Sequence, residues 1–255
     1  ENVKKMREIK ALCRIYFINM LSNKFVFIFN LLLPTGYFIF QNHRVIGKKM
    51  SFNEQTLAFL SYFWAYIILV TLLNNVIVAI ISQRESGFYK QLYFIVGSKW
   101  QILSSQVSVH WFILNIELLL FNVVFMSVTN HWDMRIIFAA FLVSVIVSLP
   151  IILLSSILVL LPIKIESLNV LTSVLIFGAF LFLKLPEGKL LQDVVTMFNP
   201  ISYIAGTADE LLLGFFHRAI ASQFIWCWLI VTLIYSLVGY FSVSKFTVNA
   251  VAKRV

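Results

Sequence analysis

The chain has 255 residues, of which 60% are hydrophobic and only 12% are charged. A soluble domain carries about twice that share of charged residues, so the composition excludes a soluble globular enzyme. One membrane-spanning helix needs about 20 apolar residues, so the length allows about six spans and leaves no room for a large soluble domain. The net charge of +9 fits basic loops beside a membrane and lipid contacts, and we expect no nucleic-acid partner.

The first segment, residues 3–21, predicts an amphipathic helix that lies along the membrane surface. Basic residues fill the positions between apolar residues that recur at helical spacing. A disordered basic tail is the alternative. The apolar positions are Val3, Met6, Ile9, Cys13, Tyr16, Phe17 and Met20.

Six apolar stretches follow, at about 25–40, 57–82, 100–128, 136–161, 169–183 and 222–243. A capping-box pattern at 51–54 precedes the second stretch, and Pro150 predicts a kink in the fourth. The expected fold is an all-α membrane protein with six transmembrane helices. We expect one transmembrane domain over 1–255, with an interfacial helix at 1–24, five spans at 25–183, and the last span with its tail at 219–255.

The distribution of basic residues predicts the orientation in the membrane. With the N-terminus inside, 13 of the 20 Lys and Arg residues fall on the inner side. This bias predicts a multi-pass protein of the cell membrane with both termini cytoplasmic. The inner loop 83–99 predicts a short amphipathic helix, because Phe88, Leu92, Ile95 and Val96 share one helical face.

The stretch 184–218 is expected on the outer side. Residues 188–198 are amphipathic but too short and polar to span, and Pro186 and Pro200 bracket them. A second capping-box pattern occurs at 207–210. We predict short reentrant helices that satisfy their own backbone groups inside the outer leaflet; a plain extracellular loop is the alternative.

Motifs for catalysis and nucleotide binding are absent from the sequence. It contains no phosphate-binding loop, no HExxH, no GxSxG and no paired CxxC. The four His residues are scattered, so no metal site is predicted. We therefore expect no enzyme and no cofactor bound by this chain.

Polar residues within the spans are the next candidates, because ionisable groups in lipid are costly. Glu117 lies deep in the third span, and His110 and Gln106 share its face. This stripe could relay protons in a carrier, or it could simply satisfy helix packing. Two further stripes of polar residues could serve either helix packing or a substrate path. One contains Thr71, Asn74 and Asn75, and the other contains Asn169, Thr172 and Ser173.

Two short motifs occur in a fixed order along the chain. Arg84-Glu85-x-Gly87 is followed by Leu92, and Leu185-Pro186 is followed by the run 199–203, Asn-Pro-Ile-Ser-Tyr. In this order they resemble the cytoplasmic "RExG…L" element and the "LP…NP…Y" outer segment of the type-2 ABC exporter permeases. Phe182-Leu183-Lys184 stands where a Ser-Gly turn often precedes the family's "LP".

The resemblance implies partners and roles for named residues. Such a permease pairs with a second copy of itself or a homologous permease, and with ABC ATPase subunits that carry ATP and Mg²⁺. The implied ATPase-coupling residues are Arg84, Glu85, Gly87, Phe88, Lys90, Lys164 and Glu166. The implied substrate path contains Thr71, Asn75, Thr172 and Ser173, and the implied outer gate contains Pro186, Asn199, Pro200 and Tyr203.

The implied function is the export of an amphipathic or lipid-linked cargo, such as a peptide, an antibiotic or a glycan-lipid, driven by a separate ATPase. The alternative is a stand-alone proton- or ion-coupled carrier that uses Glu117 and His110. Carriers often contain internal repeats with midplane breaks, and no repeat is evident here. An intramembrane enzyme needs paired catalytic groups at membrane depth, which the sequence does not provide.

Overall fold

The computed structural model describes residues 2–22, 24–43, 46, 53–163, 165–217 and 219–250. Within these ranges the regular structure is helical, with no strand. The elements are α1 (Asn2–Ser22), α2 (Lys24–Gln41), α3 (Glu54–Leu72), the π-helix η2 (Leu73–Val78), α4 (Ala79–Glu85), α5 (Phe88–Val96), α6 (Lys99–Thr129), α7 (Met134–Ser155), the 3₁₀ turn η3 (Ser156–Leu160), α8 (Ile165–Leu181), α9 (Leu190–Met197), α10 (Pro200–Phe216) and α11 (Ser222–Lys245).

Four of the helical segments are long and apolar enough to cross a membrane. They are Glu54–Glu85, Lys99–Thr129, Met134–Leu160 and Ser222–Lys245. Two shorter apolar helices, Ile28–Gln41 and Ile165–Leu181, coincide with the first and fifth predicted stretches. The protein is therefore an all-helical, membrane-embedded chain.

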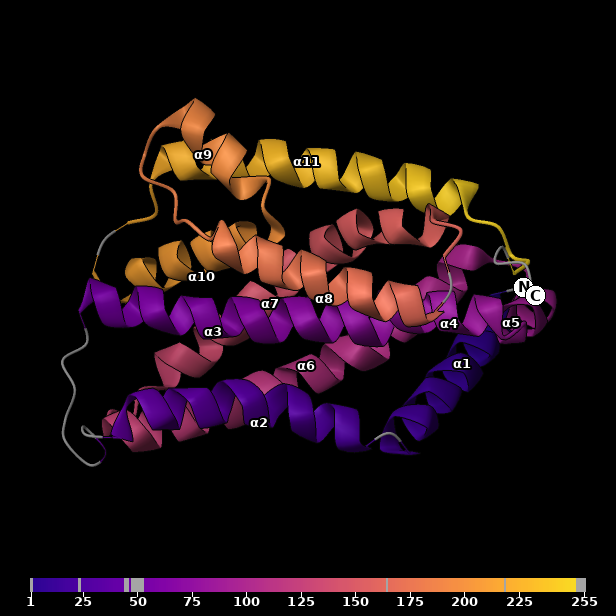
Figure 1. The fold of residues 1–255 in the computed structure, drawn as a ribbon, viewed down its shortest axis with the longest axis horizontal. Helices are drawn as coiled ribbons and strands as arrows, with labels where there is room; N and C mark the ends of the chain where they lie inside the picture. The colour runs from indigo at the N-terminus through magenta and orange to yellow at the C-terminus, as the bar shows by residue number, and fades with distance from the viewer. Residues whose placement is uncertain are drawn as a thin grey trace.

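The long helices α3, α6, α7, α8 and α11 run roughly along one axis (Figure 1). α1 begins and α11 ends at the same end of the molecule, where α4 and α5 also lie (Figure 1). α9 and α10 lie toward the opposite end, beside the start of α11 (Figure 1). The two ends therefore differ in construction, with the short helix α5 at one and the pair α9–α10 at the other.

One apolar core joins the helices, and its buried side chains extend from Leu12 to Phe246. α10 packs closely on α3 and α7, and most of its side chains are buried. In the centre, the Trp64 indole N–H donates to the Asn122 side-chain oxygen at 2.8 Å. This bond satisfies two buried polar groups between α3 and α6.

Side-chain caps begin several helices. Asn53 accepts a hydrogen bond from the Thr56 amide and begins α3, while Ser51, the first residue of the predicted capping box, lies outside the described residues. The predicted box at 207–210 is wrong as a helix start, because α10 already begins at Pro200 behind the Asn199 cap. The Thr207 hydroxyl instead donates to the Tyr203 carbonyl within the helix.

The N-terminal segment is confirmed as a helix, and only one stripe of its side chains packs on the bundle. Leu12 and Tyr16 are buried, and the helix packs on α6. Met6 and Phe17 are exposed, because the contact with α6 follows the stripe through Leu12 and Tyr16 and not the whole set of apolar positions.

Residues 73–78 form a π-helix in the middle of the longest apolar helix. The Ala79 amide donates to the Asn74 carbonyl, five residues earlier. A π turn leaves backbone carbonyls without their usual partners. Here the Gln106 side-chain amide donates to the Asn75 and Val76 carbonyls at 3.0 and 3.3 Å, so α6 completes the backbone bonding of this turn.

Candidate functional site

A groove of about 910 Å³ lies between α2, α3 and α8. Its α3 wall presents Tyr62, Tyr66, Val70 and Asn74, which recur every four residues and therefore share one helical face. On the other side, the Phe180 ring of α8 lies with its centre 5.7 Å from that of Tyr66. The full lining is Phe29, Asn30, Leu33, Pro34, Tyr37, Gln41, Phe59, Tyr62, Phe63, Tyr66, Val70, Asn74, Ser173, Ile176, Phe177, Phe180 and Leu183.

The groove is mainly aromatic, but hydrogen-bonding groups are spread along it. Asn30 is buried, and its side-chain nitrogen has no hydrogen-bond partner among the described residues. Tyr62, Tyr66 and Asn74 add hydroxyl and amide groups to the same lining. Lipid tails supply no partner for such groups, so the lining suits an amphipathic molecule better than lipid alone.

The predicted substrate path overlaps this groove at Ser173 only. Thr71 instead faces α6, where its hydroxyl donates to the Glu117 carboxylate at 2.6 Å. Thr172 is buried and donates to the Asn169 carbonyl of its own helix. Asn75 lines a separate cavity. Three of the four residues predicted for a substrate path thus lie outside the groove lining, and their role in transport stays a prediction.

The groove contains residues that the sequence reasoning missed, notably Asn30, Tyr62, Tyr66 and Phe177. The four-residue spacing on α3 is a signal that could have revealed Tyr62 and Tyr66. Aromatic residues are so frequent in this chain that the spacing alone did not separate a groove wall from ordinary core packing.

The predicted stripe of Gln106, His110 and Glu117 lies within the buried interior. Glu117 accepts from Thr71, and its second oxygen has no partner among the described residues. Gln106 and His110 line a small polar cavity that Glu117 does not reach. Within the described ranges no hydrogen bond joins His110 to Glu117, and a proton relay through the two side chains stays a prediction.

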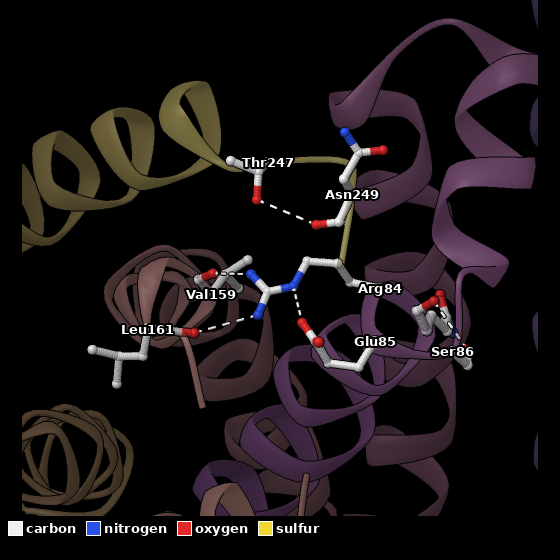
Figure 2. Close-up of polar contacts among 8 residues, drawn as sticks. Arg84, Glu85, Ser86, Val159, Leu161, Thr247 and Asn249 are labelled. Carbon is white, nitrogen blue, oxygen red and sulfur yellow. Dashed lines mark hydrogen bonds and ion pairs between the residues drawn. The ribbon is translucent and has the colours of Figure 1, made fainter. Parts of the chain in front are cut away.

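Arg84, at the end of α4, joins three parts of the chain. Its guanidinium donates to the Val159 and Leu161 carbonyls and to the Glu85 carboxylate (Figure 2). The same group lies 5.5 Å from the centre of the Phe246 ring, just after α11. Arg84 is only 1% exposed. The donors of Arg84 are therefore occupied inside the chain, and its contact with an ATPase stays a prediction.

The short helix after Arg84 is confirmed, with a packed face different from the predicted one. Gly87 has φ of +81° and turns the chain into α5, a conformation that glycine adopts without strain. Tyr89 and Leu92 are buried, whereas Phe88 and Ile95 are exposed, because α5 rests on the bundle through the Tyr89–Leu92 face.

The other residues predicted to contact an ATPase differ in their exposure. Lys90 on α5 and Glu166 at the start of α8 are exposed at the end of the molecule that carries α4. Glu85 is largely covered beside Arg84, with its side chain 8% exposed. Lys164 lies outside the described residues. Among the predicted coupling residues that the structure describes, the exposed charges are thus those of Lys90 and Glu166.

The predicted gate residues meet at the opposite end. Asn199 caps α10 by accepting from the Ile201 amide, and its side-chain nitrogen donates to the Ala179 carbonyl of α8 at 2.7 Å. The Tyr203 hydroxyl lies 2.7 Å from that of Thr232 on α11. Pro200 occupies the first helical position, which suits proline because no amide hydrogen is needed there.

The segment before α10 is tightly folded. Asp193 is 2% exposed, and its carboxylate accepts from the Glu187 and Gly188 amides. Pro186 packs over Gly206 of α10, where a Cβ would stand 2.9 Å from the proline ring. A plain unstructured loop is therefore wrong for this stretch, because buried hydrogen bonds fix its course.

Comparison with known proteins returned no matching protein family, no matching curated protein and no matching solved structure. The site is accordingly interpreted from its own geometry.

Proposed function

We propose that this chain is the transmembrane subunit of an ATP-driven exporter of the type-2 permease kind. The observation that carries the proposal is the groove between α2, α3 and α8, which combines a large aromatic surface with scattered amide and hydroxyl groups. Such a lining suits an amphipathic or lipid-linked cargo, and a second permease subunit facing the groove would close it into a route.

In this proposal the chain crosses the cell membrane six times. α2 and α8 are the first and fifth spans, joined to the four helices that are long enough by themselves. α1 lies along the cytoplasmic surface, both termini are cytoplasmic, and α9 and α10 enter the outer leaflet as reentrant helices. The exposure of Phe177 (66%) and Tyr37 (58%) on the groove side supports a partner or lipid on that face.

ATP binding and hydrolysis, with Mg²⁺, belong in this proposal to a separate ABC ATPase. The end that carries α4 and α5 would receive it through Lys90, Glu166 and the exposed side of α5. Arg84 acts there as a positioning residue, because it holds α4 against η3 and the end of α11. A push on α5 would then move the groove wall, since α4 continues through η2 into α3.

The first experiment tests the partner across the groove. In a background with Cys13→Ala and Cys227→Ala, a Phe177→Cys variant is oxidised in native membranes. We expect a disulfide-linked dimer of two copies, or a heterodimer with a homologous permease identified by mass spectrometry. The control is Leu149→Cys on α7, a position of similar exposure (59%) outside the groove, which should stay monomeric. Equal cross-linking of both variants would contradict the proposal.

The second experiment tests the ATPase. The tagged chain is purified from membranes in mild detergent, and its ATPase activity and bound proteins are measured. We expect a stoichiometric ABC ATPase, released by the pair Lys90→Glu and Glu166→Lys but retained by Lys189→Glu at the opposite end. A chain that purifies alone under every solubilisation tried, without ATPase activity, would overturn the proposal and favour the carrier.

A further inference from the structure

A second cavity, of about 110 Å³, lies between α1, α6 and the region of η2 and α4. Its lining differs in composition from that of the aromatic groove, because most of its side chains carry hydroxyl, amide or imidazole groups. The lining residues are Tyr16, Asn19, Met20, Asn74, Asn75, Ala79, Gln83, Gln106, His110 and Ile113.

Four buried polar atoms in this lining have no hydrogen-bond partner among the described residues. They are the Tyr16 hydroxyl, the side-chain oxygens of Gln83 and Gln106, and Nδ1 of His110. Tyr16 and Gln106 are 2% and 1% exposed. A buried polar group without a partner is costly, so this concentration of four around one cavity indicates a missing hydrogen-bonding ligand.

The orientation of Gln106 is fixed by the π-helix. Its side-chain nitrogen donates to the Asn75 and Val76 carbonyls, which leaves its oxygen as an acceptor. Asn74 and Asn75, two consecutive residues of the π turn, both line the cavity. The irregular turn therefore builds the polar lining in the middle of an apolar helix.

The lining specifies the chemistry of its ligand. Among the described residues no Lys, Arg, Asp or Glu lines the cavity, so an ionised group would meet no counter-charge from them and would pay a high desolvation cost. The two glutamine oxygens accept hydrogen bonds and cannot donate them, so the ligand must supply N–H or O–H groups. The volume is below the roughly 150 Å³ of a cavity that takes benzene, which limits the ligand to the size of a carboxamide or a short hydroxylated group.

Asn74 connects this cavity to the groove, because it belongs to both linings. We propose that the two form one composite binding site, in which the groove takes the apolar chain of the cargo and the polar cavity takes its small, uncharged, hydrogen-donating headgroup. This inference rests on the proposed function and names the class of cargo: a neutral amphiphile with an amide or hydroxyl head.

The test compares two probes with the same chain. Octanamide donates hydrogen bonds from its head, whereas methyl octanoate only accepts them. Each carries a photoreactive diazirine in its chain and is cross-linked to the purified protein in lipid nanodiscs, with labelled residues mapped by mass spectrometry. We expect both probes to label α2, α3 or α8, and octanamide to bind about three- to tenfold more tightly, which corresponds to about one net neutral hydrogen bond.

Single substitutions distinguish the contribution of the polar cavity from that of the aromatic groove. Tyr16→Phe removes a hydroxyl that bonds to no described residue, so the fold should persist while the advantage of octanamide over the ester shrinks, with both glutamine oxygens still in place. Gln83→Leu should act in the same way. Phe180→Ala should weaken both probes alike, and Tyr240→Phe, exposed on α11, should change neither.

The inference is overturned if the amide and ester bind equally to the unsubstituted protein, or if Tyr16→Phe lowers both equally. Density for water alone in the cavity of the octanamide complex would also overturn it. The assay needs neither ATPase nor transport. Groove labelling without amide preference would therefore reject the composite site and leave the exporter proposal standing, whereas labelling outside the groove by both probes would count against the groove itself.

Discussion

Gly239 of α11 lies directly against the backbone of Leu153 on α7. A Cβ added at Gly239 would come within 2.5 Å of the Leu153 Cα and 2.7 Å of its carbonyl carbon. Neighbouring Ser156 reaches the Gly239 carbonyl with its hydroxyl at 3.5 Å. Glycine thus allows the two helices to approach closely at this crossing, as small residues do in membrane helix packing.

The first prediction concerns this crossing. Gly239→Ala should destabilise the protein by about 1–3 kcal/mol, because the added methyl group meets backbone atoms that cannot rotate away. Thermal unfolding in a fixed detergent measures the effect. Gly178→Ala on α8 is the matched control, since a Cβ there meets nothing within 4 Å. Equal melting temperatures for the two variants would contradict the close approach.

The second prediction concerns Arg84. Arg84→Met should cost about 3–5 kcal/mol, because it breaks a buried ion pair and leaves the Val159 and Leu161 carbonyls without this donor. Arg84→Lys should be intermediate, since lysine keeps the charge but lacks the planar fork of donors. Denaturant unfolding gives the comparison, with the exposed Lys90→Met expected within about 0.5 kcal/mol of the parent. A stable Arg84→Met variant would disprove the positioning role.

The third prediction separates packing from proton relay at Glu117. Glu117→Gln keeps an acceptor for the Thr71 hydroxyl, so the purified complex should retain its cargo-stimulated ATPase activity. Thr71→Val removes the donor to a buried carboxylate and should cost about 1–3 kcal/mol of stability. Loss of all transport in Glu117→Gln, with the assembly intact, would instead favour the carrier.

The fourth prediction concerns pH and the turn between α6 and α7. The hydrogen bond from the Arg135 side chain holds the pKa of the Asp133 carboxyl below its ordinary value. A lowered native pKa stabilises the fold above the ordinary carboxyl pKa of about 3.9, and this contribution disappears as pH falls through the lower native value. Asp133→Asn keeps a cap for α7 and should flatten this part of the stability curve between pH 6 and pH 3. An unchanged slope in the variant would rule out Asp133 as its source.

The fifth prediction concerns the contact between α10 and α8. Asn199→Ala removes both the α10 cap and the donor to the Ala179 carbonyl, and should cost about 2 kcal/mol. Asn199→Asp retains the capping oxygen and loses only the donor, so it should cost about half as much. Thermal unfolding of the two variants and the parent separates the two contributions. Equal values for the two variants would mean that the cap contributes nothing, and an Asn199→Asp variant as stable as the parent would mean that the bond to α8 contributes nothing.

The helices could be predicted from the sequence because long apolar runs leave few alternatives. The third stretch was expected at 100–128 and forms Lys99–Thr129. Short polar sequence patterns were less specific as predictors of where a helix begins. The 207–210 pattern lies inside α10, because a capping box also occurs by chance within a helix that already has a cap and a proline at its start.

The site was harder to predict, because it depends on which face each helix turns to its neighbours. Asn74 and Asn75 are adjacent in sequence, yet only Asn74 reaches the groove. Arg84 lies in a motif that implies an interface, and only the positions of Val159 and Phe246 reveal that its donors are already occupied. Sequence spacing contains no information about these distant partners.

The wide turn at 73–78 lets the helix hold one extra residue between α3 and α4. Each residue of an α-helix advances the direction of its side chain by about 100°, and a π turn, which bonds five residues apart, advances less per residue. Deleting one residue from this turn would therefore restore a regular helix while α4 keeps nearly its present direction and Arg84 still points toward Val159. The backbone carbonyls that the Gln106 side chain now bonds would then return to the helix ladder, so a one-residue deletion would alter the polar cavity and leave the two ends of this helix in phase.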